Sequence, residues 1–396
     1  MMARWLAIGW LYLMGVIAAA QLGKMSALLP LIQADLMLGL TTAALVVSLL
    51  ELGGATIGLM AGRAIARIGY RRALLAGIAL LALAGLGEGL AGGAVSLLAW
   101  RVVEGVAYLA VVIAAPLLIM QTALPNQRGV ALALWSSFVP VGLALGAILS
   151  GIVADLWSWR GALVGGSAIA FAAAICTLLL PIGRHGPVAA PMSRPARPGP
   201  AAWKLTMAFG CYTAFEVGLL ALLPIFLVDR AGASTSAAGL VTGIASFVTV
   251  LGSFVAAWQA HARRGQRLSM VVAIILPAAM LFLVFQDAPV PAVAATAAIV
   301  LNAISGIFPG LAFAMLPQVA RTDRELASAN GLFTQFGAAG SLLGPPLFAA
   351  CAGSFGWWAA AACGAVASIG CLVLMMSVTK VGAAPSASCD LAENST

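Results

Sequence analysis

Charged residues are scarce in this sequence: only 8% of its 396 residues are Asp, Glu, Lys or Arg, against about 25% in an ordinary soluble domain. A soluble protein of this length needs a charged surface, and these residues are too few to make one. Hydrophobic residues make up 63% of the chain, and its mean hydropathy is +1.08. The composition therefore excludes a soluble globular protein and predicts that lipid surrounds most of the chain.

Motifs for catalysis, nucleotide binding and metal binding are also missing. The two histidines fall in predicted loops, no HExxH stretch occurs, and none of the six cysteines forms a CxxC pair. A Gly-rich phosphate-binding loop ending in Lys-Ser or Lys-Thr is absent too, which argues against ATP as the energy source. We therefore expect no enzyme activity, no cofactor and no metal site, and an ion or solute gradient as the driving force.

Long apolar stretches are what the sequence does contain. Each has about the 20 residues that a membrane-spanning helix needs, and runs of this length suit helices because backbone groups in lipid must be satisfied internally. The first stretch continues past Lys24 to Ile32, which predicts a spanning helix rather than a cleaved signal peptide. The twelve predicted spans are residues 5–32, 42–62, 73–91, 95–120, 129–153, 160–182, 204–228, 236–258, 268–286, 291–316, 326–350 and 355–378.

Basic residues gather in alternate loops. If the N-terminus is cytosolic, the outer loops hold only Arg160 and Arg230, and the other loop Lys and Arg residues lie inside. Because cytosolic loops carry an excess of Lys and Arg, we expect a multi-pass protein of the inner (cytoplasmic) membrane with both termini in the cytosol. The net charge of +8 then reflects topology, and no nucleic-acid partner is expected.

The two halves of the chain repeat each other. ALLPLIQAD at 27–35 matches ALLPIFLVD at 221–229, an offset of 194, and RIGYR at 67–71 aligns with RRGQR at 263–267, an offset of 196. A Pro-rich, basic stretch without apolar periodicity separates the halves. The sequence thus predicts a six-helix bundle over 1–182, a cytosolic linker over 183–203, a second six-helix bundle over 204–380 and a disordered cytosolic tail over 381–396.

Two motifs resemble the major facilitator superfamily. GLMAGRAIARIGYRR at 58–72 is similar to the family's loop between helices two and three, and LLAWRVVEGVAY at 97–108 to its fourth helix. Ala66 stands where the loop usually has aspartate, so the charge cluster that latches the halves there is expected to be weakened or built from other residues. The gating-loop candidates implied by the resemblance are Gly58, Gly62, Arg63, Arg67, Gly69, Arg71 and Arg72.

The resemblance implies two pseudo-symmetric six-helix bundles, a monomer, and a small solute carried between the bundles by alternating access. It also implies a part in proton transfer for Arg101. The glycine signature of many drug antiporters is absent from its usual place in helix five. WSSFVPVG at 135–142 is loosely similar to cyanate- and nitroimidazole-type permeases.

Charged side chains within the predicted spans cost roughly 2.5–3.5 kcal/mol each on insertion scales, so each is a functional candidate. Arg101 and Glu104 share a helix face, either as a structural ion pair or with Glu104 as a proton carrier controlled by Arg101. Glu51 either pairs with Arg101 or Lys24 or is the main protonation site. The candidates for substrate binding and proton coupling are Lys24, Glu51, Arg101, Glu104 and Glu216.

Lys24 and Glu216 are predicted to lie at similar depth, because they precede the equivalent prolines Pro30 and Pro224 by six and eight residues. We hypothesise that they pair across a central cavity and hold the empty site closed until a proton or a substrate anion separates them. The alternative is that each meets a different partner, or that Lys24 reaches toward the outer interface.

Neutral polar residues within the spans are expected either to bond neighbouring helices or to line the cavity. They are Tyr12, Gln21, Tyr212, Asn302 and Gln335. The sequence as a whole predicts a secondary transporter of a small solute, with an organic anion or zwitterion favoured by Lys24 and Arg101, coupled to protons and embedded in the bilayer. Multidrug or metabolite efflux by proton antiport, and a non-transporting receptor on the same fold, are the alternatives.

Overall fold

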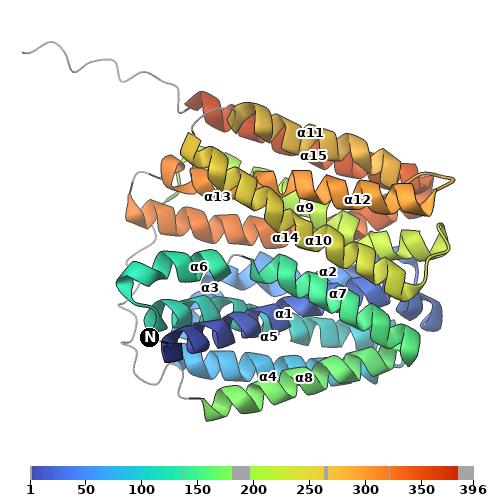
Figure 1. Ribbon diagram of the computed structural model, residues 1–396, viewed down its shortest axis with the longest axis horizontal. Helices are drawn as coiled ribbons and strands as arrows, with labels where there is room; N and C mark the ends of the chain where they lie inside the picture. The colour runs from blue at the N-terminus through green and yellow to red at the C-terminus, as the bar shows by residue number, and fades with distance from the viewer. Residues whose placement is uncertain (1, 136, 181–196, 263–265, 321, 382–396) are drawn as a thin grey trace, which may run out of the picture.

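The computed structural model describes residues 2–135, 137–180, 197–262, 266–320 and 322–381, and its helices run along one long axis (Figure 1). Twelve helical segments in this part of the chain are long and apolar enough to cross a membrane, which confirms the predicted all-α fold class. Most of the predicted linker at 183–203 and nearly all of the predicted tail at 381–396 lie outside the described residues.

The two halves lie side by side as separate layers of helices (Figure 1). The N-terminal half consists of α1 (Met2–Asp35), α2 (Leu40–Ser48), η1 (Leu49–Glu51), α3 (Leu52–Ile68), α4 (Tyr70–Gly89), α5 (Ala94–Thr122), η2 (Pro125–Gln127), α6 (Arg128–Trp135), α7 (Phe138–Leu156) and α8 (Trp159–Leu179). The C-terminal half consists of α9 (Pro200–Asp229), α10 (Thr235–Ala262), α11 (Gln266–Val284), α12 (Pro291–Ser305), α13 (Ile307–Val319), α14 (Asp323–Phe355) and α15 (Trp357–Val381).

In the described part of the chain, two of the candidate spans consist of more than one helix. The second is α2, η1 and α3, and the tenth is α12 followed by α13. The first helix of the C-terminal half begins at Pro200, before the predicted start at 204, because a proline fits the first helical turn, where no intrahelical N–H bond is needed.

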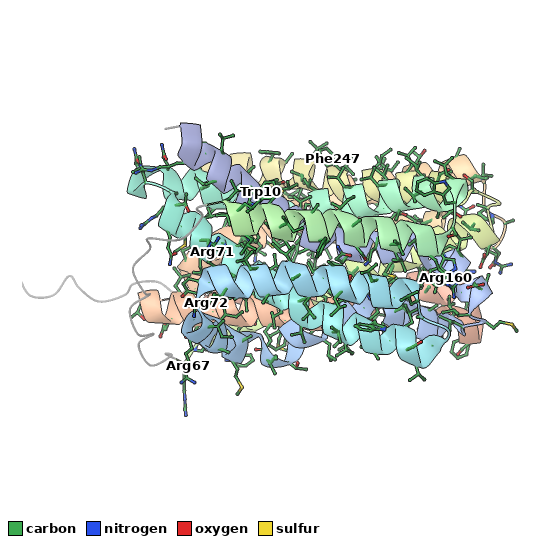
Figure 2. The ribbon with its side chains drawn as sticks, turned by 90° about the horizontal axis from the view of Figure 1, so that it is seen from below. Trp10, Arg67, Arg71, Arg72, Arg160 and Phe247 are labelled. Carbon is green, nitrogen blue, oxygen red and sulfur yellow. The ribbon has the colours of Figure 1, made fainter. Side chains whose placement is uncertain are left out.

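The molecule has two chemically different ends. The end where α1 begins is called the terminal end, and the opposite one the Asp35 end. Figure 2 shows Arg67, Arg71 and Arg72 at the terminal end and Arg160 at the other. Between them, large apolar side chains such as that of Phe247, which is 50% exposed, cover the sides of the bundle, as expected for a surface in contact with lipid.

Glycines allow the same close helix contact in both halves. A Cβ on Gly146 of α7 would overlap the backbone of Ala20 on α1, and a Cβ on Gly344 of α14 would overlap the backbone of Ala214 on α9. Small residues at such positions let membrane helices pack backbone to backbone. The matching contacts show that the two bundles are built alike.

The halves contact each other through α1 with α9, α7 with α10, and α14 with α2 and α3. At the first of these contacts, the hydroxyl of Ser26 donates a hydrogen bond of 2.5 Å to the carbonyl of Leu220. The two residues are 194 positions apart, which equals the repeat offset in this region. Equivalent positions of the two repeats therefore touch, as expected beside a pseudo-twofold axis.

Candidate functional site

Four charged side chains meet inside the N-terminal half. Nζ of Lys24 on α1 lies 2.9 Å from a carboxylate oxygen of Glu88 on α4 and 2.7 Å from one of Glu104 on α5. Arg101, one turn before Glu104, forms an ion pair with it and lies 3.5 Å from Glu88. Three of these side chains are fully buried and that of Lys24 is 9% exposed. Two positive and two negative charges thus form a balanced group, here called the charge cluster.

Glycines leave space for this charge cluster. A Cβ on Gly85 of α4 would lie 3.5 Å from Nζ of Lys24 and would overlap the Ser167 hydroxyl on α8. On α5, a Cβ at Gly105 would lie 2.8 Å from the carbonyl oxygen of Leu50. The missing side chains therefore allow α4 and α5 to approach their neighbours around the charged groups.

Arg101 also binds the point where the second span is interrupted. Its Nε donates to the carbonyl of Val46 at 2.6 Å, and its Nη2 donates to the carbonyl of Val47 at 3.1 Å. These carbonyls belong to the last turn of α2, which ends at Ser48. Because the C-terminal end of a helix carries partial negative charge, the guanidinium stabilises a helix end that lies within the membrane.

The hypothesis that Lys24 pairs directly with Glu216 is wrong. Lys24 already binds Glu88 and Glu104 within its own half, whereas Glu216 lies on α9 beside Tyr212 and Thr249. Similar depth on α1 and α9 did not identify the partner of Lys24, because the direction in which its side chain points from α1 decides which helix it contacts. Each of the two charges therefore meets a different partner, and Lys24 does not reach toward the outer interface.

Glu88 was not among the predicted candidates, although it contacts both cations of the charge cluster. It lies close to the end of the predicted span 73–91, where a charged residue is unremarkable. The structure ends α4 at Gly89 and buries the Glu88 side chain completely. The signal available in the sequence was a single carboxylate in the otherwise apolar stretch GLGEGL.

Glu51 lies in η1, at the interruption of the second span. Its carboxyl group is beside Tyr108 of α5, and among the described residues no ion pair joins it to Arg101 or Lys24. One turn away, Gly54 packs on Ala338 of α14. Glu51 therefore borders the contact between the halves, and of its two predicted alternatives the direct ion pair is wrong.

The five neutral candidates lie in different places. Tyr12 hydrogen-bonds Ser137 at 3.0 Å, and Gln21 donates to the carbonyl of Ile17 at 2.9 Å, both within the N-terminal half. Gln335 of α14 donates to the carbonyl of Ala55 at 3.0 Å and so joins the halves. Tyr212 and Asn302 are buried in the C-terminal half, where the hydroxyl of one and the amide oxygen of the other have no hydrogen-bond partner.

The sequence matches the Major Facilitator Superfamily over residues 11–324 and again over residues 205–388. The chain belongs to the Major Facilitator Superfamily. Members of this family are membrane transporters rather than enzymes. The family resemblance that the two motifs indicated is thus confirmed, and the match covers nearly the whole chain.

Individual relatives within this superfamily are more distant. A candidate metabolite transport protein, YwtG of Bacillus subtilis, is 30% identical over 178 residues, 44% of this chain and 37% of that protein. The uncharacterised MFS-type transporter Rv1250 of Mycobacterium tuberculosis is 35% identical over 138 residues, 33% of this chain and 23% of that protein. The chain therefore spans well under half the length of these two relatives.

Solved structures resemble the fold over almost its full length. A bacterial homologue of the human lysosomal transporter Spinster, crystallised in an inward-facing and occupied conformation, has a TM-score of 0.75 and 16% sequence identity. The similarity covers 96% of this chain and 95% of that one. It supports two six-helix bundles of the superfamily type.

The predicted gating loop of this superfamily protein lies at the terminal end. Gly69 has a φ of 94°, which ends α3 and allows the tight turn into α4. Arg71 donates to the carbonyls of Thr177, Leu178 and Leu180 near the end of α8, at 3.0–3.3 Å. These contacts stay within the N-terminal half. Arg67 and Arg72 are exposed, a Cβ at Gly58 or Gly62 would meet nothing within 4 Å, and the side chain of Arg63 lies outside the described residues.

Hydrogen bonds between the halves lie at the Asp35 end and in the middle of the described part. A carboxylate oxygen of Asp155, near the end of α7, accepts from the backbone N–H of Ser236 at 3.0 Å, in the first turn of α10. Ser246 donates to the carbonyl of Pro140 at 3.3 Å nearer the middle. Together with the Ser26 and Gln335 bonds, these contacts hold the halves together away from the terminal end.

Proposed function

We propose that this chain is a secondary active transporter that moves a small solute by alternating access and is driven by protons bound at the charge cluster of Lys24, Glu88, Arg101 and Glu104. The observation that carries the proposal is the burial of two acids and two bases in mutual contact at membrane depth. Such residues within spans are rare and mark proton and ion pathways.

The charge balance of the cluster supports a protonation switch. With all four groups charged, the cluster is neutral. One added proton on Glu88 or Glu104 would leave one positive charge in excess and weaken the attraction that holds Lys24. Low dielectric surroundings make this imbalance costly, so protonation favours a rearrangement that gives Lys24 a new environment.

α1 connects the cluster to the other half. Lys24 is two residues from Ser26, whose hydroxyl binds the carbonyl of Leu220 on α9. A shift of α1 on release of Lys24 would therefore act directly on the contact between the halves. This supports coupling between proton binding and the alternation of access, because one helix participates in both events.

The expectation of an organic anion or zwitterion relied on Lys24 and Arg101 as cations of the cavity, and both bind carboxylates of the protein. Glu51 borders the contact between the halves, is partly exposed and has no ion pair among the described residues. We therefore favour a small solute with an amine group, such as a zwitterion, over a simple anion. Binding between two repeats is the usual position in such transporters.

The predicted orientation follows from the basic side chains. Described basic residues at the terminal end include Arg67, Arg71, Arg72, Arg128, Lys204 and Arg267, against Arg160 and Arg230 at the Asp35 end. This asymmetry supports a cytosolic terminal end in an inner membrane. Because the hydrogen bonds between the halves lie away from the terminal end, we propose that this conformation opens toward the cytosol. We also propose that the transporter works as a monomer.

The test is proton flux in proteoliposomes. Purified protein is reconstituted with a trapped pH dye and challenged with small zwitterions, organic anions and cationic drugs. We expect a pH change that depends on a zwitterion and is absent in empty liposomes and in Glu104→Gln. The sign of the change distinguishes symport from antiport, and full coupled flux in Glu104→Gln would contradict the proposal.

A further inference from the structure

The C-terminal half contains a carboxylate at membrane depth that no described Lys or Arg neutralises. Glu216 lies in the middle of α9, and among the described residues no ion pair joins it to a Lys or Arg. The basic residues of the spans in this half are Lys204 and Arg267, both at the terminal end. An unpaired carboxylate in such a place needs either a proton or a cation from outside the protein.

Neutral oxygen atoms surround this carboxylate. Tyr212 and Thr249 lie beside Glu216, and Tyr212 also lies beside Ser305 of α12. The hydroxyl of Tyr212 nevertheless has no well-directed hydrogen bond. Asn302, which is fully buried, donates its amide to the carbonyl of Ala298 at 2.8 Å and leaves its amide oxygen without a partner. Buried oxygens in this state indicate a missing ligand.

Glu216 and Asn302 lie on the same side of the contact between Tyr212 and Ser305. α9 runs from the terminal end toward the Asp35 end, and α12 runs the other way. The steps from Tyr212 to Glu216 and from Ser305 to Asn302 therefore both lead toward the Asp35 end, by about 6 Å and 4.5 Å. Tyr212 lies beside Ser305, so Glu216 and Asn302 are each about one turn from this contact, in the same direction.

The interruption of the tenth span adds negative potential at this place. α12 ends at Ser305, and Pro309 has no N–H to donate to the Ser305 carbonyl four residues earlier. The C-terminal end of α12 therefore lies within the membrane, with its partial negative charge. In the N-terminal half the other helix end within a span, that of α2, is bound by the guanidinium of Arg101. Among the described residues, no basic side chain binds the end of α12.

We propose that Glu216, Tyr212, Thr249, Asn302 and Ser305 form a binding site for a monovalent metal cation, for which Na⁺ is the best fit. The ligands are a carboxylate, hydroxyls and an amide oxygen, which suit hard cations and not transition metals. One carboxylate balances one positive charge, and a divalent ion would leave an excess charge in lipid. A proton on Glu216 would not supply a partner for the amide oxygen of Asn302, whereas a cation can bind both.

The test is Na⁺-dependent stability of the purified full chain in detergent. The unfolding midpoint is measured with NaCl, KCl and choline chloride at equal ionic strength. We expect a saturable rise of ~2–4 °C or more with NaCl and none with choline chloride, because a ligand that binds the folded state stabilises it. Glu216→Gln should abolish the rise, and Thr249→Val, which keeps the side-chain shape, should raise the Na⁺ concentration needed by about tenfold or more.

Asp287→Asn is the control, because it also removes one carboxylate, from a residue that is exposed in a loop at the Asp35 end. Its response to Na⁺ should equal that of the wild type. An equal effect of all three salts, or an unchanged Na⁺ response in folded Glu216→Gln or Thr249→Val, would overturn the site. The site is independent of the proposed proton coupling: a Na⁺ response without proton flux contradicts only the coupling, and proton flux without a Na⁺ response contradicts only this site.

Discussion

Glu88 is the residue whose removal tests the charge cluster most directly. In Glu88→Gln, Lys24 and Arg101 would face Glu104 alone, with one positive charge in excess in a fully buried place. Removal of one partner from a buried ion pair costs about 3–5 kcal/mol. We expect a lower unfolding midpoint in detergent and loss of solute-driven proton flux.

A second substitution should reverse part of this loss. Lys24→Met removes the excess charge, so the Lys24→Met/Glu88→Gln double variant should be more stable than the sum of the single changes predicts. Asp287→Asn is the control, because Asp287 is exposed in a loop at the Asp35 end, and its unfolding midpoint should not change. Additive effects of the two cluster substitutions would show that Lys24 and Glu88 are not coupled.

Single residues also mark where sequence reasoning about the site stopped. The five candidate charges could be found because an ionisable residue inside an apolar stretch has no other obvious use. Their partners could not, since the rotation of α1 and α4 about their axes decides whether Lys24 meets Glu88 or Glu216. Hydropathy along the chain predicts where a helix begins and ends, but it says little about how the helix is rotated about its axis.

Among the helices, the interruption of the second span gives the next prediction. Arg101→Lys keeps the positive charge beside Glu104 but cannot reproduce the bonds of a planar guanidinium to the carbonyls of both Val46 and Val47. Hydrogen bonds to charged groups contribute about 1.5–3 kcal/mol each, so the end of α2 should be less ordered. Hydrogen exchange of the α2 amides should rise in Arg101→Lys, while that of α8, which Arg101 does not contact, stays unchanged. Equal exchange of α2 in both proteins would contradict a role of Arg101 at this helix end.

The close contact between α1 and α7 is possible because Gly146 has no side chain. In Gly146→Val the new atoms would overlap the backbone of Ala20, and overpacking of this kind costs about 1–3 kcal/mol. Gly165→Val on α8 introduces the same residue where a Cβ meets nothing within 4 Å. The unfolding midpoint should fall clearly more in Gly146→Val than in Gly165→Val, and equal midpoints would show that the helices are not closely packed there.

At the level of helices the sequence was most informative. The twelve spans followed from apolar length alone, because lipid imposes that length on each helix. The interruptions at η1 and at Gly306 were not predicted, although Pro309 indicates the second one. The first has no proline, and the helix end there is bound by Arg101, which lies far away in the chain. Long-range contacts of this kind are what a linear pattern leaves out.

For the whole molecule, alternation of access requires the contacts at the Asp35 end to break. The carboxylate of Asp155 on one half accepts from the N–H of Ser236 at the start of α10 on the other. An acidic group at a helix N-terminus is stabilising by about 0.5–2 kcal/mol, both as a cap and through the helix dipole. This energy is available only while the halves touch at the Asp35 end.

Asp155→Ala should therefore shift the population toward the state that is open at the Asp35 end. A loss of about 1 kcal/mol changes the ratio of the two states about fivefold. Spin labels on the exposed residues Trp157 and Leu240, in a cysteine-free background, would report this shift as a larger share of long distances. Asp287→Asn removes a carboxylate from the same end, from a residue exposed in a loop, and its distance distribution should match that of the parent protein. If Asp155→Ala also matches the parent, the closed Asp35 end is held by the helix packing of α7 on α10 alone, and the hydrogen bond has no part in selecting the state.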